Sequence, residues 1–587
     1  KLIGELELLI NLVEMARVTG VLINELVQHA QQYKVLSQLC RACRDMDYLI
    51  PYKHKERAGE GSPESSEGGG ASYQGATVLN AKTGSYWSPI CTLDFASLYP
   101  SIIIAYNLSY ETLVREPGEQ AEADKQRLRT LEFDVSGSNE DQVGGAKFKF
   151  IQSWTDPDGR EHDGILPRIL RRLLKARKDA KLAMQGQTDQ QMKKILNGRQ
   201  LAYKISCNSI YGFCGATNGY LPCLPLAATV TAIGRDLINR TRSLIERDFT
   251  AQHACAATVV YGDTDSVMID FHLPGSSAKD IEQAMDFGQR AAQAVTKTFP
   301  APIKLEFEKV YCPYLLFSKK RYAGLMFSSS AQSPEKIDVK GIETVRRDSC
   351  PFVQEVYNEC LEVVMRTSPP DVDKAISLVR TRVSELVEGR VPLVKLVLCR
   401  PVGKDGSKGR APHMELVKRM NERGRNSPAT GERLQYVQVI NSTEKVYRTC
   451  DSVEDPAFAV KNELNVDYEW YVNNQLKNPI VKLFEVLVPN AEARIFGHSS
   501  RSMGSGVRLI KHFQPSSNIM RNYIIKGHKC IGCSKSVTQS SAQSDKPPRI
   551  LCSDCEADKE DHVLAAQASL IETQHSRNAL WKQCQLC

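Results

Sequence analysis

The stretch VVYGDTDSVMI, from Val259 to Ile269, places Asp263 and Asp265 between two apolar runs with high β propensity. Gly and Asp are ordinary turn residues, so one interpretation is a β-hairpin whose turn has no further role. In an extended chain, however, residues i and i+2 share a face, so the two carboxylates can aim at one point. Their mutual repulsion would be relieved by a hard divalent cation. The hairpin therefore predicts a metal site if a third carboxylate and phosphate-binding groups exist elsewhere.

The bulk composition describes a multidomain globular chain. It has 587 residues, of which 42% are hydrophobic and 25% charged, with a formal net charge of +8. No apolar run approaches the ~20 residues of a membrane helix, which argues against an integral membrane protein, and no signal peptide is evident. The mild positive charge is a weak indication of a polyanionic partner. Because the chain opens at Lys1 inside an amphipathic pattern, we interpret it as a piece of a longer product.

Composition shifts divide the chain into segments. We expect a helical segment at 1–54, a disordered Gly/Ser/Glu-rich linker at 55–72 and a strand-rich block at 73–160 with a polar insertion at 116–145. A strongly helical stretch at 161–216 and a mixed α/β region at 217–345 follow. Residues 346–515 are expected to be mainly helical, with an interruption rich in Gly, Lys, Arg and Pro at 402–431, and 525–587 form a cysteine-rich tail.

A third carboxylate lies in PICTLDFASLYPSI, from Pro89 to Ile102. The first part of this stretch predicts a buried strand that ends at Asp94, and the second part predicts a helix. An Asp at this junction often caps the helix, and that alternative stays open. If Asp94 instead meets Asp263 and Asp265, the three acids would form a site for one or two Mg²⁺ ions.

Two predicted helices offer phosphate-binding groups. Arg177 and Lys181 are four residues apart and share one helix face, although a basic face is often only solvated. Lys204, Asn208 and Tyr211 form a second stripe, which resembles neither a core stripe nor a plain charged face. Lys and Arg bind triphosphate oxygens by point charge and by a bidentate fork. Gly212, next to this stripe, lacks a Cβ where another group could approach closely.

The segments DFASLYPSI, KISCNSIYGFCGA and YGDTDSV occur in this order and resemble motifs A, B and C of family B DNA polymerases. YQGATV, LEFEKVYCPYLLFSKKRYAGL and CIGC resemble the replicative delta type of that family. The resemblance covers nearly the whole chain. It implies a multidomain α/β (α+β) right hand, with a palm at 73–160 and 217–345, fingers at 161–216, a thumb at 346–515 and a zinc-binding module at 525–587.

The resemblance also implies roles for individual residues. Asp94 and Asp265 would be the principal Mg²⁺ ligands, Asp263 would contribute, the Phe95 carbonyl would complete a site, and Glu306 or Glu308 would hold an accessory metal. Tyr99 would exclude the ribose 2′-hydroxyl, with a simple core tyrosine as the alternative. The expected dNTP-binding set is Ser97, Leu98, Tyr99, Arg177, Lys181, Lys204, Asn208, Tyr211 and Gly212. The expected DNA-binding set is Lys319, Lys320, Arg321, Tyr322 and Lys340.

The function implied by the resemblance is template-directed addition of dNTPs to a primer 3′-hydroxyl with two Mg²⁺ ions, in nuclear DNA replication. The expected partners are primer-template DNA, dNTPs, accessory polymerase subunits and a sliding clamp, with no membrane. A zeta-type translesion polymerase and a non-catalytic polymerase-fold scaffold are the alternatives. Because residues 1–72 lack the acidic signature of a 3′–5′ exonuclease, we expect this chain to polymerise without proofreading.

The C-terminal cysteines form C-x-x-C pairs. Cys530, Cys533, Cys552 and Cys555 have the spacing of a four-cysteine zinc site. A zinc-dependent, sequence-specific DNA-binding protein is a rival reading, but the tail shows no basic recognition helix. Cys584 and Cys587 resemble half of the 4Fe-4S site of the full-length family member. A cluster needs about four thiolates, so we expect none to be complete here.

Overall fold

The computed structural model describes residues 7–51, 74–115, 117–125, 128–135, 147–156, 158–159, 161–253, 256–367, 369–403, 411–440, 452–497, 528–529 and 536–537. The predicted linker at 55–72, residues 136–145 of the polar insertion and all six cysteines of the predicted metal sites lie outside these residues.

A seven-stranded antiparallel sheet organises the middle of the chain, in the order β12-β11-β10-β2-β9-β8 with β1 paired to β10. Alternate residues of each strand face opposite sides. Cys91, Leu93 and Phe95 of β2 enter the main core, whereas Ile90 enters a second cluster rich in tyrosine. Asp94, four residues after Ile90, therefore belongs to the tyrosine-rich face. The strands are β1 (Gly84–Tyr86), β2 (Ile90–Phe95), β8 (Thr258–Asp263), β9 (Ser266–Asp270), β10 (Leu305–Ser318), β11 (Arg321–Phe327) and β12 (Lys336–Lys340).

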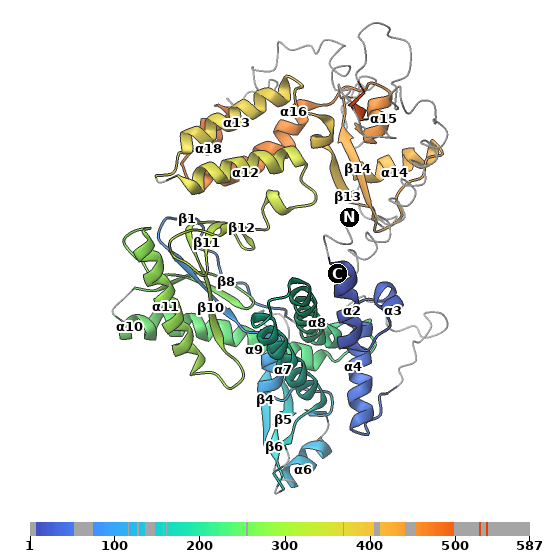
Figure 1. Cartoon of the computed structure of the whole chain (residues 1–587), viewed down its shortest axis with the longest axis vertical. Helices are drawn as coiled ribbons and strands as arrows, with labels where there is room; N and C mark the ends of the chain where they lie inside the picture. Colours follow the sequence, from blue (N-terminus) through green and yellow to red (C-terminus); the bar gives the residue numbers. More distant parts are fainter. Residues whose placement is uncertain are drawn as a thin grey trace.

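Helices cover the core face of this sheet and extend beyond it (Figure 1). The amphipathic helix α11 packs on β10 and β2, and α9 packs on α5 and α8. The predicted helical stretch is the antiparallel pair α7 and α8, which contact each other along their length. The bounds are α5 (Leu98–Ala105), α7 (Ile165–Gln185), α8 (Gln190–Gly215), α9 (Leu224–Ser243), a π-helical turn at Leu244–Phe249, α10 (Thr250–His253) and α11 (Ala278–Thr296). Small strands β3 (Leu113–Val114), β4 (Thr130–Asp134), β5 (Lys147–Ile151), β6 (Trp154–Thr155) and β7 (Glu161–His162), with α6 (Pro117–Lys125), precede α7.

The N-terminal helices α2 (Leu8–Thr19) and α4 (Gln31–Asp45) support the α7–α8 pair, and α3 (Ile23–Gln28) packs on α2. Both α2 and α4 pack on α8 (Figure 1). Glu14 of α2 is buried and accepts a hydrogen bond from Nε of Arg199 at 2.6 Å. A buried carboxylate needs such a partner, so the ion pair fixes α2 against α8.

The later part of the chain has its own hydrophobic core. It contains α12 (Pro351–Arg366), α13 (Val372–Val387), α14 (Pro412–Glu422), α15 (Pro456–Lys461), α16 (Tyr468–Trp470), a π-helical turn at Tyr471–Leu476, α17 (Lys477–Glu485) and α18 (Ala491–Phe496). Within the stretch expected to be mainly helical, β13 (Leu398–Pro401), β14 (Arg433–Gln438) and β15 (Val453–Glu454) also form a sheet. These strands are short and far apart in sequence, so local periodicity gave little sign of their pairing.

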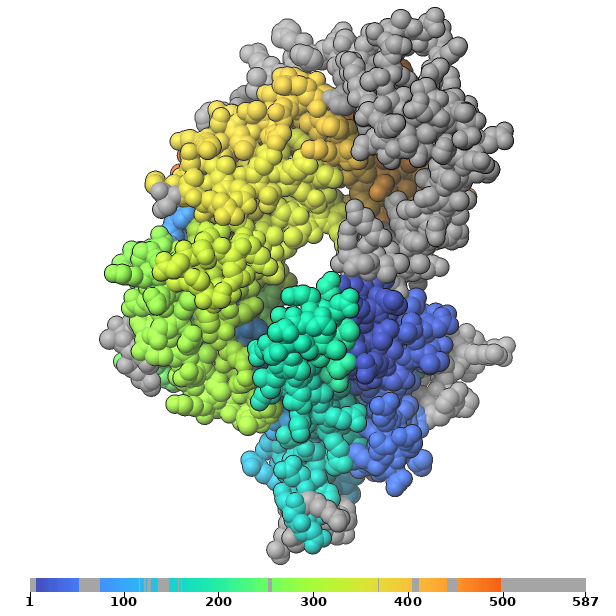
Figure 2. Space-filling model, viewed as in Figure 1, coloured from blue at the N-terminus to red at the C-terminus, as the bar shows by residue number. Residues whose placement is uncertain are grey.

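The space-filling view shows a central opening in the molecule (Figure 2). The described part of its rim is formed by the region around α7 and α8 on one side, and by the sheet and the helical region that follows it on the other.

Candidate active site

The strand register brings the two motif carboxylates to one edge of the sheet. Asp94 lies opposite Ser266 of β9 on one side and Glu306 of β10 on the other. The Phe95 amide donates a hydrogen bond to the Asp265 carbonyl at 2.8 Å. Asp94, near the end of β2, and Asp265, in the turn between β8 and β9, therefore lie close to each other.

Burial and mutual repulsion make the ionised forms of these carboxylates unfavourable. Burial raises the pKa of Asp94 to about 7, and the nearby Asp265, Glu308 and Glu306 add to this rise while Lys309 opposes it. Burial also raises the pKa of Asp265, with contributions from Asp263 and Glu308. A divalent cation would neutralise this excess of negative charge.

Asp263 does not join this pair. Nζ of Lys320 lies 2.7 Å and 2.9 Å from its two carboxylate oxygens, and the hydroxyl of Thr264 donates to it at 3.1 Å. The rule that residues i and i+2 share a face applies to extended backbone, but Thr264 has a left-handed φ of 59°. The turn therefore directs Asp263 to Lys320 and Asp265 to the cavity, although the two aspartates remain close enough to interact electrostatically.

Among the described residues, no group of three or more His, Cys, Asp or Glu side chains is arranged so that it could hold a metal ion. This differs from the expected cluster of three aspartates. Mg²⁺ is commonly held by one or two carboxylates together with waters and substrate phosphates. The donor chemistry of Asp94 and Asp265 fits such a two-carboxylate site.

The opposite wall is cationic. Arg177 and Lys181 of α7 and Lys204 of α8 are close enough that Arg177 and Lys204 add to the effect of burial in lowering the pKa of Lys181. Nε of Arg177 is buried and has no hydrogen-bond partner among the described residues. An unsatisfied buried donor costs about 1–3 kcal/mol, and a bound oxyanion would supply the missing acceptor.

A cavity of about 560 Å³ separates the acidic and basic walls. It contains all the predicted dNTP-binding residues except Gly212, and it adds Ala96, Pro100 and Thr264, which the motif reading did not assign. Its lining is Asp94, Phe95, Ala96, Ser97, Leu98, Tyr99, Pro100, Arg177, Lys181, Lys204, Asn208, Tyr211, Thr264, Asp265 and Glu306.

Three predicted site residues are missing from this lining, although Glu308 is close enough to raise the pKa of Asp94 and of Asp265. Asp263 and Glu308 are not part of the cavity lining. A Cβ at Gly212 would meet no described atom within 4 Å. The close approach expected at this glycine is therefore not made by any described part of the chain.

Two aromatic rings form part of the cavity wall. Tyr99 of α5 and Tyr211 of α8 have ring centroids 4.4 Å apart, with an interplanar angle of 44°. Ser97, which precedes α5, has a left-handed φ of 51°. Ser97 and Thr264, both cavity-lining residues, are therefore held in a backbone conformation that costs of order 1–3 kcal/mol, and such strain is typical of functional sites.

The predicted DNA-binding residues all have partners within the chain. Nζ of Lys319 donates to the Val78 carbonyl at 3.0 Å, and Nζ of Lys340 lies 3.4 Å from Asp338. Tyr322 packs in the tyrosine cluster, with ring centroids 5.5 Å from Tyr314. Lys319, Lys320 and Lys340 are exposed, whereas Tyr322 is partly buried.

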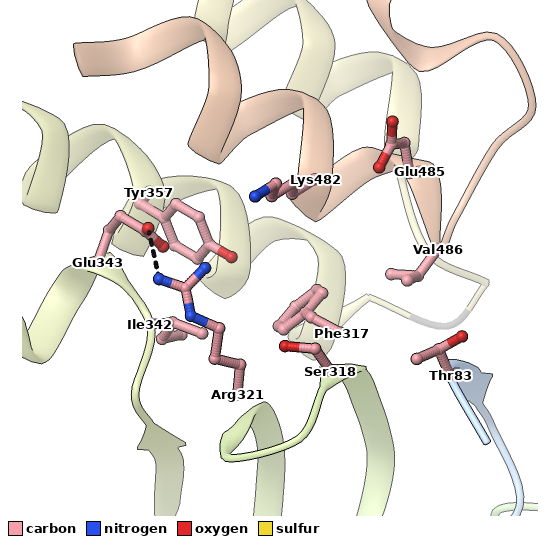
Figure 3. A pocket seen from close by; sticks show the side chains of 10 residues that line it. All are labelled: Thr83, Phe317, Ser318, Arg321, Ile342, Glu343, Tyr357, Lys482, Glu485 and Val486. Carbon is pink, nitrogen blue, oxygen red and sulfur yellow. Dashed lines mark ion pairs between the residues drawn. The ribbon is translucent and has the colours of Figure 1, made fainter. Parts of the chain in front are cut away.

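Arg321 points toward the helical region that follows the sheet. Its guanidinium lies 3.6 Å from Glu343 in a cavity bounded by Phe317, Tyr357 and Lys482 among others (Figure 3). This ion pair therefore joins β11 to the 3-10 turn at Glu343–Val345, and Tyr357 of α12 and Lys482 of α17 line the same cavity.

The sequence profile of DNA polymerase family B matches residues 21–487, which contain both walls of the cavity. The chain belongs to DNA polymerase family B. It is 38% identical over its whole length to the DNA polymerase delta catalytic subunit of Oryza sativa subsp. japonica, and 37% identical over its whole length to that of Candida albicans. It is 42% identical, over 89% of the chain, to that of Glycine max.

The chain spans about half the length of the curated relatives it matches: 49% of the rice protein, 52% of the Candida protein and 44% of the soybean protein. The predicted family B domain with mixed α/β content is confirmed. The division into palm, fingers and thumb and the zinc module remain predictions. None of the helices in the described part of the chain is long and apolar enough to cross a membrane.

Proposed function

We propose that this family B chain catalyses DNA-directed DNA synthesis, adding dNTPs to a primer 3′-hydroxyl, as the names of its relatives suggest. The observation that carries this proposal is the cavity whose acidic wall, Asp94 and Asp265, faces a basic wall of Arg177, Lys181 and Lys204. A metal-bound nucleoside triphosphate has the complementary distribution of charge, because its cations would face the carboxylates and its phosphates would face the basic side chains.

In this mechanism the carboxylates of Asp94 and Asp265 and the Phe95 carbonyl would hold two Mg²⁺ ions, and Glu306 or Glu308 an accessory ion. When bound, Mg²⁺ neutralises phosphate charge and makes the primer hydroxyl more acidic. Arg177, Lys181 and Lys204 bind triphosphate oxygens, and this orients the α-phosphorus for in-line attack. The amides of Ser97 and Leu98 assist because the first N–H groups of a helix have no intrahelical acceptor.

Tyr99 and Tyr211 bound the space for the sugar and base. We propose that Tyr99 excludes a ribose 2′-hydroxyl sterically, and that Asn208 and Gly212 border the incoming nucleotide. Lys319, Lys320, Tyr322 and Lys340 would contact primer-template DNA, largely at phosphates that carry no sequence information. Because Arg321 pairs with Glu343, its contribution would require that this pair open.

The biological setting is proposed on the relatives' names and the sequence motifs. It comprises nuclear DNA replication with accessory subunits and a sliding clamp. We also propose a palm, fingers and thumb division, a zinc site at Cys530, Cys533, Cys552 and Cys555, and half of an iron–sulfur site at Cys584 and Cys587. These cysteines lie outside the described residues.

A primer-extension assay with Mg²⁺ and the four dNTPs tests the activity. Asp265→Asn should lower the extension rate by about a thousandfold, since a metal ligand contributes several kcal/mol to the transition state. Asp263→Asn should cost far less, because Asp263 is paired with Lys320 outside the cavity. Asp286→Asn is the matched control, because Asp286 is exposed on α11 and pairs with Arg290 of the same helix.

Duplex binding should stay within about twofold in all three variants, because the affinity comes mainly from phosphate contacts. An active Asp265→Asn variant would contradict the assignment of the ligand. A wild-type chain that binds primer-template DNA but never extends it would favour the scaffold alternative.

A further inference from the structure

Residues 74–82 form an extended segment, here called the strap, that runs beside β8. The Leu79 amide donates to the Gly262 carbonyl at 2.9 Å, and the Lys82 amide donates to the Val260 carbonyl at 2.9 Å. The Thr264 amide donates to the Thr77 carbonyl at 3.2 Å. The strap therefore continues the sheet past β8 and binds the left-handed residue of the turn that carries Asp265.

Side-chain packing seats the strap on the same turn. A Cβ built at Gly262 would lie 2.7 Å from Cδ1 of the buried Leu79, which is closer than real contacts allow. Gly262 is therefore required for the close approach of the strap. The hydrogen bonds and this contact together hold Thr264 in a conformation that costs energy in isolation.

One face of α9 anchors the beginning of the strap. Nη1 of Arg235 donates to the Gln74 carbonyl at 2.7 Å and to the Gly75 carbonyl at 3.0 Å. The hydroxyl of the buried Thr231, four residues earlier, lies 3.0 Å from the same Gln74 carbonyl. Residues spaced by four share a helix face, so the side chains of Thr231 and Arg235 both reach the Gln74 carbonyl of the strap.

The same face of α9 also contacts the part of the cavity wall that Tyr99 and Tyr211 form. A Cβ at Gly234 would lie 3.5 Å from Cε1 of Tyr99, in ordinary van der Waals contact. Tyr99 and Tyr211 are also the electrostatic neighbours that oppose the effect of burial on the pKa of Arg235. α9 therefore reaches both the tyrosine wall and, through the strap, the turn before Asp265.

We propose that Arg235 is a positioning residue of the nucleotidyl-transfer site, which holds the strap and so fixes the Thr264–Asp265 turn relative to Tyr99. This inference rests on the proposed function for its catalytic consequence. Its structural consequence, a turn that loosens when the guanidinium is removed, can be measured without any activity.

The test compares Arg235→Met, Arg235→Lys and wild type. Arg242→Met is the matched control, because Arg242 is an exposed arginine of the same helix. Hydrogen exchange of the amides of Leu79 and Thr264 should be about tenfold faster in Arg235→Met, as expected for the loss of a charge-assisted hydrogen bond. Arg235→Lys should recover part of the protection, since an ammonium group can still donate to a carbonyl.

Steady-state primer extension supplies the second measurement. Arg235→Met should lower kcat about tenfold and raise the Mg²⁺ concentration needed for half-maximal rate, while the KM for dNTP changes less than about threefold. This pattern is expected because the loosened turn would displace Asp265, whereas the basic side chains on α7 and α8 would keep their positions. Arg242→Met should match wild type in both measurements.

Two results would overturn the proposal. One is unchanged exchange at Leu79 and Thr264 in Arg235→Met. The other is exchange that accelerates equally in β2 and α11, which would indicate general destabilisation. If the local exchange pattern appears but the wild-type chain extends no primer, the proposed function fails and the positioning of the turn by Arg235 stands.

Discussion

Replacing Asp94 by Asn should stabilise the metal-free chain at pH 8 even though it removes a proposed metal ligand. Asp94 is held among other carboxylates, and burial together with Asp265, Glu308 and Glu306 raises its pKa from 3.8 to about 7. A charge that is destabilised in the folded state but fully hydrated in the unfolded state lowers the free energy of unfolding. Asn has nearly the same shape and carries no charge.

The sign and size follow from proton linkage. Between pH 3.8 and about 7 the unfolded chain loses the Asp94 proton while the folded chain keeps it, so folding becomes less favourable as the pH rises. The full difference corresponds to about 4 kcal/mol. Because the side chain is only partly buried, screening by water reduces the expected cost to about 2 kcal/mol. The advantage of Asp94→Asn should thus be near zero below pH 4 and should grow with pH until Asp94 is ionised in the folded chain as well.

Thermal unfolding in EDTA at pH 5 and pH 8 measures this advantage. The melting temperature of Asp94→Asn relative to wild type should be several degrees higher at pH 8, at about 2–4 °C per kcal/mol, and the difference should be clearly smaller at pH 5. Mg²⁺ at pH 8 should stabilise wild type more than the variant, since only wild type retains the full ligand set. Asp286→Asn, at an exposed position of α11, is the control variant.

A variant that is no more stable than wild type at pH 8, or an advantage that does not grow between pH 5 and pH 8, would refute the reasoning. It would mean that Asp94 is either well hydrated or compensated by a cation of the protein. Primer extension by Asp94→Asn should be lost in every case, because the proposed ligand is missing.

Three further outcomes are expected. Tyr99→Ala should raise the ratio of rNTP to dNTP incorporation, because a steric wall discriminates by clash; an unchanged ratio would make Tyr99 a simple core residue. Gly341→Ala should lower stability by about 2–4 kcal/mol, since φ is +64° and a Cβ would lie 2.1 Å from the Lys320 carbonyl oxygen; a melting temperature equal to wild type would contradict this packing. Cys530→Ser should remove one bound zinc, as measured by metal analysis of anaerobically purified protein. Zinc retention in that variant, or stoichiometric iron and sulfide in the wild-type chain, would contradict the predicted tail.

Local periodicity in the sequence predicted the strands and helices that carry part of the cavity, whereas Phe95, Ser97, Leu98, Tyr99 and Glu306 were named only through the family resemblance. The β8–β9 hairpin, the buried strand ending near Asp94 and the two helices with one-sided cations all follow from periods of 2 and 3.6 residues. Arg177 and Lys181 line one wall because residues four apart share a helix face. The order of the three motifs then indicated that these elements belong to a single site.

Only the tertiary structure decided which charges meet. Asp263 and Asp265 are two residues apart, yet the left-handed backbone at Thr264 directs Asp265 to the cavity and leaves Asp263 to Lys320, 57 residues later in the chain. The anchoring of the strap by Arg235 joins residues 160 and 161 positions apart. Such contacts depend on strand register and on the packing of distant elements. Local sequence patterns specify neither, because they report only which face of its own element a residue occupies.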